Sequence, residues 1–219
     1  MGGDSSGRRS VAEGVGTALL LATIVGSGIM GERLSGGQAG LALLANTIAT
    51  GAALTALILT FGPISGGQFN PIVTCVEAFQ GNLSRREASA YVVAQITGAL
   101  VGVSVAHMMF DEPLYQWSQR DRSGLPQAFS EGVATFGLLT VILNCSRHDR
   151  RALPVAVGAY ITAAYWFTAS TSFANPAVTV ARAMTNTFSG IEPSNVPGFV
   201  MAQVVGAVVA TALFRWLDG

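Results

Sequence analysis

Two short strings place an asparagine, a proline and a threonine at the same spacing inside apolar sequence, first in "FNPIVT" and again in "ANPAVT". Their asparagine amides can donate and accept hydrogen bonds. Asparagine is favoured at the N-cap of a helix and proline at its first position, so each string predicts the start of a short helix. The residues expected to form these first turns are Asn70, Pro71, Ile72, Asn175, Pro176 and Ala177.

Two carboxylates also occupy matching places, Glu13 in "AEGVGT" and Glu131 in "SEGVAT". A carboxylate inside an apolar segment is a candidate functional residue. For Glu13 a second interpretation stays open, a capping box with Ser10 at the start of its segment. The sequence has no Cys/His cluster and no nucleophile beside a base, so we expect no catalytic residue, no metal site and no cofactor.

The elements around these residues have the composition of a membrane protein. Hydrophobic residues make up 50% of the chain and charged residues 11%, against about 25% charged residues in soluble domains. An apolar helix of about 20 residues crosses a bilayer core of about 30 Å. Six runs are candidate spans: Gly14–Gly31, Ala39–Phe61, Ala88–Phe110, Leu125–Ser146, Pro154–Phe167 and Pro193–Phe214.

The distribution of arginine predicts the orientation, because cytoplasmic loops carry an excess of basic residues. With the N-terminus inside, the cytoplasmic side collects Arg8, Arg9, Arg85, Arg86, Arg147, Arg150, Arg151 and Arg215, and the outside Arg33, Arg120 and Arg122. We therefore expect a multi-pass protein of the inner (plasma) membrane with both termini in the cytoplasm. The net charge of zero says nothing about nucleic acid, and for a membrane protein we expect no nucleic-acid partner. We expect no disulfide between Cys75 and Cys145.

The sequence contains an internal repeat. Besides the two pairs of strings above, "AQITGALVG" recurs as "AQVVGAVVA", and all three pairs follow in the same order. We therefore expect a first repeat over residues 1–110, an extracellular connecting loop over 111–124 and a second repeat over 125–219. Each repeat contains three spans and one half-helix, so the second enters the membrane from the opposite side.

The half-helices also explain the fifth apolar run. Residues 152–181 contain no charge, which is too long for one span and too short for two. A span followed by a re-entrant half-helix fits this length. Irregular backbone at membrane depth occurs only where it is buried in protein or lines a cavity. Inversion then brings the N-termini of the two half-helices together near the midplane, which predicts a pore.

Six spans in inverted halves with paired Asn-Pro boxes resemble the aquaporin or major intrinsic protein family over nearly the whole chain, and "SGGQFNP" and "AEGVGT" are close to its motifs. The resemblance implies the aquaporin fold, an all-α membrane protein with six transmembrane helices and two re-entrant half-helices. It implies a passive channel rather than an enzyme, and a homotetramer in the lipid bilayer. Glu13 and Glu131 would accept hydrogen bonds from the re-entrant loops. Ile72 replaces the usual alanine and is expected to narrow the inner side locally.

Family members set their selectivity with four outer residues, which are found here by counting from the asparagines. Thr50 stands where an aromatic residue is usual, Ala163 where water-selective members carry histidine, and Val178 where most carry arginine; Ser172 completes the set. This predicts a wide, mostly apolar, arginine-free ring. The pattern is most similar to that of bacterial aquaglyceroporins associated with arsenic resistance. It implies passage of arsenite, methylated arsenicals, glycerol-like polyols and water.

Arg182 lies four residues beyond Val178, hence on the same helical face and about 6 Å further outward. Two interpretations stay open. Arg182 borders a basic outer vestibule, with its repeat counterpart Glu77 at an acidic inner mouth, or it pairs with a loop carboxylate or a lipid headgroup.

Other functions remain as alternatives. One alternative is a protein that is mainly a water and glycerol facilitator. An ion-coupled secondary transporter requires ionisable residues at mid-membrane, and the spans offer only glutamates near helix starts. Channels of the formate/nitrite or ammonium type do not carry the doubled Asn-Pro string, and an intramembrane enzyme lacks its residues.

Overall fold

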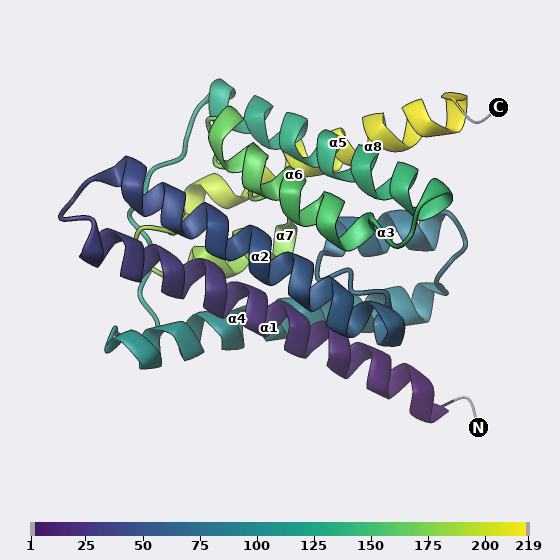
Figure 1. The fold of residues 1–219 in the computed structure, drawn as a ribbon, viewed down its shortest axis with the longest axis horizontal. Coiled ribbons are helices and arrows are strands. Elements are labelled where there is room, and N and C mark those ends of the chain that lie inside the picture. Colours follow the sequence, from purple (N-terminus) through teal and green to yellow (C-terminus); the bar gives the residue numbers. More distant parts are fainter. Residues whose placement is uncertain (1–2, 218–219) are drawn as a thin grey trace.

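The computed structural model describes residues 3–217, with side chains from residue 6 to residue 217. Within this range the chain is helical (Figure 1). The elements are α1 (Gly3–Leu34), α2 (Ala39–Ser65), α3 (Pro71–Phe79), α4 (Arg85–Phe110), α5 (Leu125–His148), α6 (Leu153–Phe167), α7 (Pro176–Arg182), a 3₁₀ turn (Pro193–Asn195) and α8 (Val196–Leu217).

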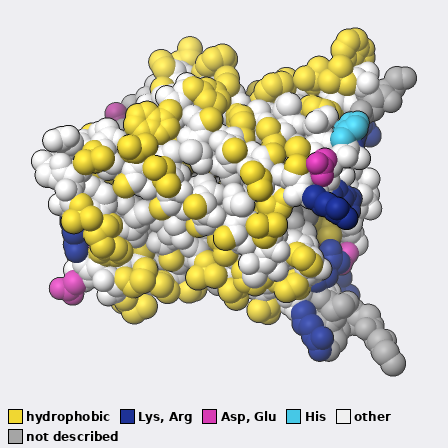
Figure 2. Space-filling view, viewed as in Figure 1, with side chains coloured by type: hydrophobic (Ala, Val, Ile, Leu, Met, Phe, Trp, Pro, Cys, Tyr) yellow, Lys and Arg dark blue, Asp and Glu magenta, His cyan; other side chains and the backbone are white. Residues whose placement is uncertain are grey.

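Five helices are long and apolar enough to cross a membrane: α1, α2, α4, α5 and α8 with its preceding 3₁₀ turn. The fifth predicted span is shorter. Helix α6 has 15 residues and is therefore about 22 Å long; it ends where Thr168 adopts an extended backbone (φ −108°, ψ 137°). On the face shown in Figure 2, hydrophobic side chains surround the middle of the molecule and charged side chains gather towards its two ends.

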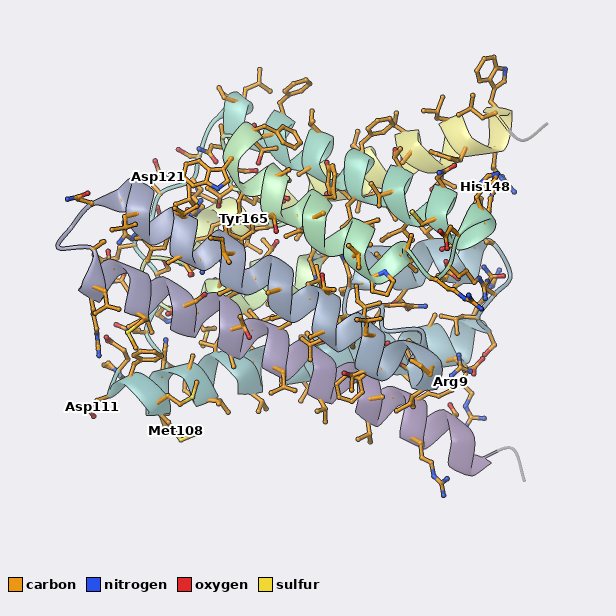
Figure 3. The ribbon with its side chains drawn as sticks, viewed as in Figure 1. Arg9, Met108, Asp111, Asp121, His148 and Tyr165 are labelled. Carbon is orange, nitrogen blue, oxygen red and sulfur yellow. The ribbon has the colours of Figure 1, made fainter. Side chains whose placement is uncertain are left out.

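The helices form two groups in the same order. Helix α1 packs against α2 and α4, and α5 packs against α6 and α8, while contacts between α2 and α6 join the groups. Helix α1 begins and α8 ends at the same end of the bundle (Figure 1). Figure 3 places Asp111 and Asp121, from the connection between α4 and α5, at the opposite end from Arg9 and His148.

Glycines allow the long helices to cross closely. A Cβ atom at Gly98 of α4 would collide with the carbonyl oxygen of Gly14 in α1, and one at Gly206 of α8 with that of Gly132 in α5. Small residues at such crossings let helix backbones approach within van der Waals contact. The two groups of helices therefore use the same close contact, α1 with α4 and α5 with α8.

The two predicted half-helices are α3 and α7. Asn70 is the N-cap of α3, and its side-chain oxygen accepts a hydrogen bond from the backbone of Ile72 at 3.0 Å. Asn175 caps α7 in the same way, accepting from Ala177 at 3.0 Å and from Val178 at 3.3 Å. A proline follows each cap, because the first helical N–H has no intrahelical partner to lose.

Candidate functional site

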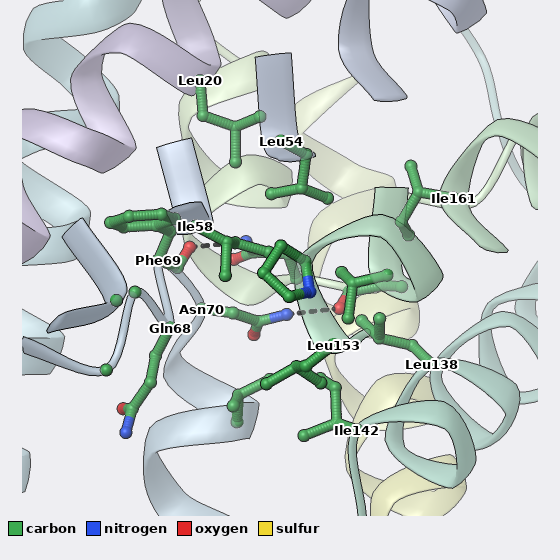
Figure 4. Close-up of a pocket in the computed structure, with 18 of the residues that line it drawn as sticks. Leu20, Leu54, Ile58, Gln68, Phe69, Asn70, Leu138, Ile142, Leu153 and Ile161 are labelled. Carbon is green, nitrogen blue, oxygen red and sulfur yellow. Dashed lines mark hydrogen bonds between the residues drawn. The ribbon is translucent and has the colours of Figure 1, made fainter. Parts of the chain in front are cut away.

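The two half-helices meet at their N-termini through a reciprocal pair of hydrogen bonds. The side-chain nitrogen of Asn70 donates to the carbonyl of Ala174 at 2.8 Å, and that of Asn175 donates to the carbonyl of Phe69 at 2.8 Å (Figure 4). Each amide nitrogen carries two hydrogens. One is used in this contact, so one N–H of each asparagine remains for the cavity that both residues line.

The same arrangement concentrates positive potential at one point. Each helix N-terminus carries the equivalent of about half an elementary charge, and α3 and α7 both begin beside the cavity. Two such ends repel a cation and favour a solute that presents an acceptor oxygen. The centre of the site is therefore suited to neutral, oxygen-bearing solutes.

Glu13 holds the loop that precedes α3. One of its carboxylate oxygens accepts from the hydroxyl of Ser65 at 2.6 Å and the backbone of Gln68 at 3.0 Å. The other accepts from the backbone of Phe69 at 2.7 Å and the side chain of Gln95 at 2.9 Å. Glu13 is fully buried, and these four donors compensate the loss of water around its charge.

Glu131 is the counterpart for the loop that precedes α7. Its Oε1 accepts from the backbone of Phe173 at 2.8 Å, and its Oε2 from the backbone of Ala174 at 2.8 Å and from the side chain of Gln203 at 2.7 Å. Both glutamates thus connect a long helix to the residues just before an Asn-Pro pair.

The capping-box interpretation of Glu13 is wrong. Helix α1 already begins at Gly3, so Ser10 and Glu13 both lie inside it and not at its N-terminus. A capping box requires the serine at the N-cap.

The sequence interpretation missed two glutamines and two threonines that complete these networks. Gln95 also donates to the hydroxyl of Thr74 at 2.9 Å, and Gln203 to that of Thr179 at 2.9 Å. The signal was present, because the third repeated string begins with Ala-Gln in both copies and each Asn-Pro string ends with threonine. Equal polar residues in equal places of two apolar repeats indicate shared contacts.

A cavity of about 540 Å³ passes beside the two asparagines. Its lining extends from Glu77, Arg150 and Arg151 to Thr50 and Arg182. Between these ends the wall is largely apolar, and Figure 4 shows the side chains of Leu20, Leu54, Ile58, Leu138, Ile142 and Ile161 around the space. A solute in a long apolar passage loses hydrogen bonds to water and finds few protein groups to replace them. Each polar group in the wall can therefore lower the free energy of the solute at its position.

Three of the four predicted filter residues line this cavity, namely Thr50, Ser172 and Val178, but Ala163 does not. Ala163 is exposed on the outside of α6, whereas Ile161 and Tyr165 are buried and line the cavity. Residues four apart share a helix face, and the residue midway between them points elsewhere. Counting twelve residues back from Asn175 therefore selected the wrong face of the helix.

Because Tyr165 lines the cavity in place of Ala163, this end of the cavity has a hydroxyl group on an aromatic ring. The hydroxyl of Tyr165 donates to the hydroxyl of Thr50 at 3.3 Å, and Figure 3 locates Tyr165 within the bundle. The lining at this end therefore contains an aromatic residue with a hydroxyl group, although Thr50 stands where an aromatic residue is usual. Thr50, Ser172 and Val178 do line the cavity.

Of the residues that follow each Asn-Pro pair, one is buried in the protein core and the next lines the cavity. Ile72 is 7% exposed and Ala177 fully buried, and the cavity lining contains neither. Val73 and Val178, one residue further along, line it instead. The expected narrowing by Ile72 is therefore wrong, because the helix turns its side chain into the core.

Arg182 is buried, with 2% of its surface exposed, at the end of the cavity opposite Glu77, Arg150 and Arg151. Its Nε donates to the carbonyl of Ser189, and its guanidinium lies 3.5 Å from the ring centre of Phe173. No ion pair of the described residues includes Arg182, so pairing with a loop carboxylate is excluded there. The lining at this end contains a guanidinium, although it comes from one helical turn beyond Val178.

Arg122, from the connection between α4 and α5, approaches the same aromatic ring. Its guanidinium carbon lies 5.0 Å from the ring centre of Phe173, and its Nε donates to the carbonyl of Gly190 at 2.8 Å. Burial lowers the pKa of Arg122 to about 10, so the group stays protonated at neutral pH. At the opposite end of the cavity, the half-buried carboxylate of Glu77 accepts from the side-chain nitrogen of Asn82 at 2.9 Å.

Known proteins share both the sequence and the fold. The profile of the major intrinsic protein family matches residues 4–172 and 146–218. Aquaglyceroporin AqpS of Rhizobium meliloti is 58% identical over 96% of this chain and 90% of its own length. Glycerol uptake facilitator protein-like 6 of Lactiplantibacillus plantarum is 29% identical over 79% of this chain and 84% of its own. The X-ray structure of the aquaglyceroporin from Plasmodium falciparum matches with a TM-score of 0.74 at 21% identity, over 95% of each chain.

Proposed function

This chain belongs to the major intrinsic protein family and is a membrane channel of the aquaglyceroporin type for small neutral solutes such as water and glycerol, and we propose that it also conducts arsenite and methylated arsenicals. Arsenite at neutral pH is the uncharged arsenous acid, a metalloid hydroxide about as polar as a small polyol. The relative AqpS is named an aquaglyceroporin, which supports a polyol-sized cargo.

The observation that carries this proposal is Val178 in the cavity wall. It stands three residues after Asn175, and a valine there is shorter than an arginine and uncharged. Its apolar side chain leaves room for a solute wider than water between Thr50 and Ser172, which line the same end. The guanidinium of Arg182 enters about 6 Å further out, four residues along α7.

Several further features belong to this proposal. We place the protein in the plasma membrane as a homotetramer, with both termini in the cytoplasm, because basic residues are more numerous at the end where α1 begins and α8 ends. Residues 1–110 and 125–219 act as two inverted repeats. In this arrangement Asn70 and Asn175 lie at the midplane of the pore.

The test is a change of filter size at Val178 in proteoliposomes. Val178→Arg places a long cation in the wall, so we expect the permeability to glycerol and arsenous acid to fall at least about tenfold while water still passes; a tenfold change corresponds to about 1.4 kcal/mol in the barrier. Stopped-flow light scattering measures water, glycerol and urea, and filtration uptake measures arsenicals.

Val178→Leu is the matched control, since it adds volume without charge and is expected to reduce solute permeability less. Unchanged solute permeability in Val178→Arg contradicts the assignment of Val178 to the filter. A wild type that passes water and glycerol but neither arsenous acid nor methylated arsenicals supports the alternative, a plain water and glycerol facilitator.

A further inference from the structure

Two polar side-chain atoms in the wall of the cavity have no hydrogen-bond partner among residues 6–217. They are Oγ of Ser172 and Nη1 of Arg182. Both residues are almost fully buried, at 3% and 2% exposed, and both line the cavity. A buried donor or acceptor without a partner is costly, so such groups in the wall of a transport path indicate a partner that passes through.

The guanidinium of Arg182 is held in place on its other sides. Its Nε is anchored to the carbonyl of Ser189, and its plane lies against the ring of Phe173, with 3.5 Å between guanidinium carbon and ring centre. Phe173 follows Ser172 in the chain, so the arginine packs on the neighbour of the serine, and both side chains line the same cavity. An anchored guanidinium offers its remaining N–H groups without first losing side-chain freedom.

No carboxylate among the described residues forms an ion pair with Arg182, so its positive charge can act on a solute in the cavity. The ion pairs among residues 6–217 are Arg9–Glu87, Arg33–Glu112 and Arg120–Glu32. None of them reaches Phe173, whose ring faces the two guanidiniums of Arg122 and Arg182. Two cations without a carboxylate partner disfavour positively charged solutes and favour an acceptor oxygen.

We propose that Arg182 and Ser172 form a binding station for solutes that carry an acceptor oxygen beside a hydroxyl or amino donor. Nη1 of Arg182 donates to the acceptor oxygen of the solute, and Oγ of Ser172 accepts from its neighbouring donor group. The station compensates the solute for lost hydration before it enters the apolar section between Leu54 and Ile161. This inference rests on the proposed channel function and specifies the chemistry of its cargo at one level of the path.

Urea is the probe, because it carries a carbonyl oxygen and amino donors on one carbon atom. The variants are Ser172→Ala, Arg182→Met and the double variant, in proteoliposomes with the full chain. The readout is the ratio of urea permeability to water permeability in the same vesicles. Differences in protein content or in the fraction of open pores cancel in this ratio. Arg120→Met is the control, since Arg120 is exposed and pairs with Glu32 away from the cavity.

We expect the urea-to-water ratio to fall about threefold in Ser172→Ala and about tenfold in Arg182→Met, the range of one neutral and one charged hydrogen bond. The double variant falls by less than the product of both losses, because a solute that has lost one contact no longer holds its other polar group in place for the second. Arg120→Met stays at the wild-type ratio. A wild-type ratio in Ser172→Ala, or a double variant with the full product of both losses, overturns the station.

If Arg182→Met does not fold, Ser172→Ala still decides the test, because it removes an oxygen atom that forms no hydrogen bond with the described residues. The outcome is also separable from that of the proposed cargo. A wild type that passes urea but not arsenical solutes contradicts the cargo, while the urea-to-water ratios still decide the station.

Discussion

The chain has two re-entrant segments, one that ends in α3 and one that ends in α7. The same types of residue hold both segments in place, but the residues that they contribute to the cavity wall differ. Each carries asparagine, proline, valine and threonine at the same spacing, and each is held by a buried glutamate and a glutamine. Seven residues after the asparagine they diverge, with half-buried Glu77 on one side and buried Arg182 on the other. The repeated residues hold the two half-helices in the same way, and the divergent ones place a carboxylate at one end of the cavity, beside Arg150 and Arg151, and a guanidinium at the other.

The backbone of the two loops differs as well. Four and three residues before the asparagine, the first loop has Gly66 and Gly67 with φ of 98° and 62°, whereas the second has Thr171 and Ser172 with φ of 60° and 50°. A left-handed conformation costs an L-residue about 1–2 kcal/mol. The outer loop therefore carries strain in order to place a side chain, that of Ser172, in the cavity wall.

The largest expected effect distinguishes the two glutamates. In Glu13→Gln the amide NH₂ faces two donors whichever oxygen it replaces, because each carboxylate oxygen of Glu13 accepts two hydrogen bonds. Each unpaired buried donor costs about 1–3 kcal/mol, so we expect the free energy of unfolding to fall by about 2–5 kcal/mol. We also expect all solute flux to be lost. Thermal unfolding in detergent and stopped-flow permeability measure both.

Glu131→Gln is the matched variant. Its Oε1 accepts a single hydrogen bond, from Phe173, so the amide NH₂ can be placed there with one donor unpaired. We expect about half the destabilisation of Glu13→Gln. Equal unfolding temperatures for wild type and both variants would show that the carboxylates do not hold the loops.

The next effect concerns the contact between the half-helices. Asn175→Leu removes the N-cap of α7 and the hydrogen bond to Phe69, and it places an apolar side chain where a solute needs a donor. Loss of the cap costs about 0.5–2 kcal/mol, and flux of water and solutes is expected to fall at least about tenfold. Asn70→Leu should act equally, because the bonds are reciprocal. Full flux in either variant places the pore elsewhere.

The smallest effect tests the backbone difference. Gly67→Ser introduces a Cβ at φ 62°, within 3.2 Å of the backbone nitrogen of Gly62, and is expected to destabilise the protein by about 1–2 kcal/mol. Thr171→Gly makes the opposite kind of change at the neighbouring position of the other loop, where φ is 60°, and should be neutral or slightly stabilising, since it relieves a left-handed conformation. A shift of equal sign in the unfolding midpoints of both variants contradicts the strain argument.

Much of the fold could be predicted from local sequence. The apolar runs located the spans because length and composition suffice for a helix in lipid. The paired strings around Asn70 and Asn175 located the half-helices, because capping is a local property of the chain. The family resemblance is confirmed by the profile match and by the 58% identity to an aquaglyceroporin.

The wall of the site could not be predicted as well. Whether Ala163 or Tyr165 faces the cavity depends on the rotation of α6 about its axis, which packing against α2 and α5 determines. The burial of Arg182 depends on Phe173 and on the carbonyl of Ser189, which spacing within α7 cannot reveal. Thr50 could be placed by counting, because α2 leads without interruption to the loop before Asn70.

The most direct test of the central claim measures uptake of glycerol and arsenous acid by wild-type proteoliposomes with ionophores present to abolish proton and sodium gradients. A passive channel for small neutral solutes predicts fast uptake of both solutes, linear in their concentration gradient and unchanged by the ionophores. Uptake that requires a proton or sodium gradient would contradict the account and indicate an ion-coupled transporter.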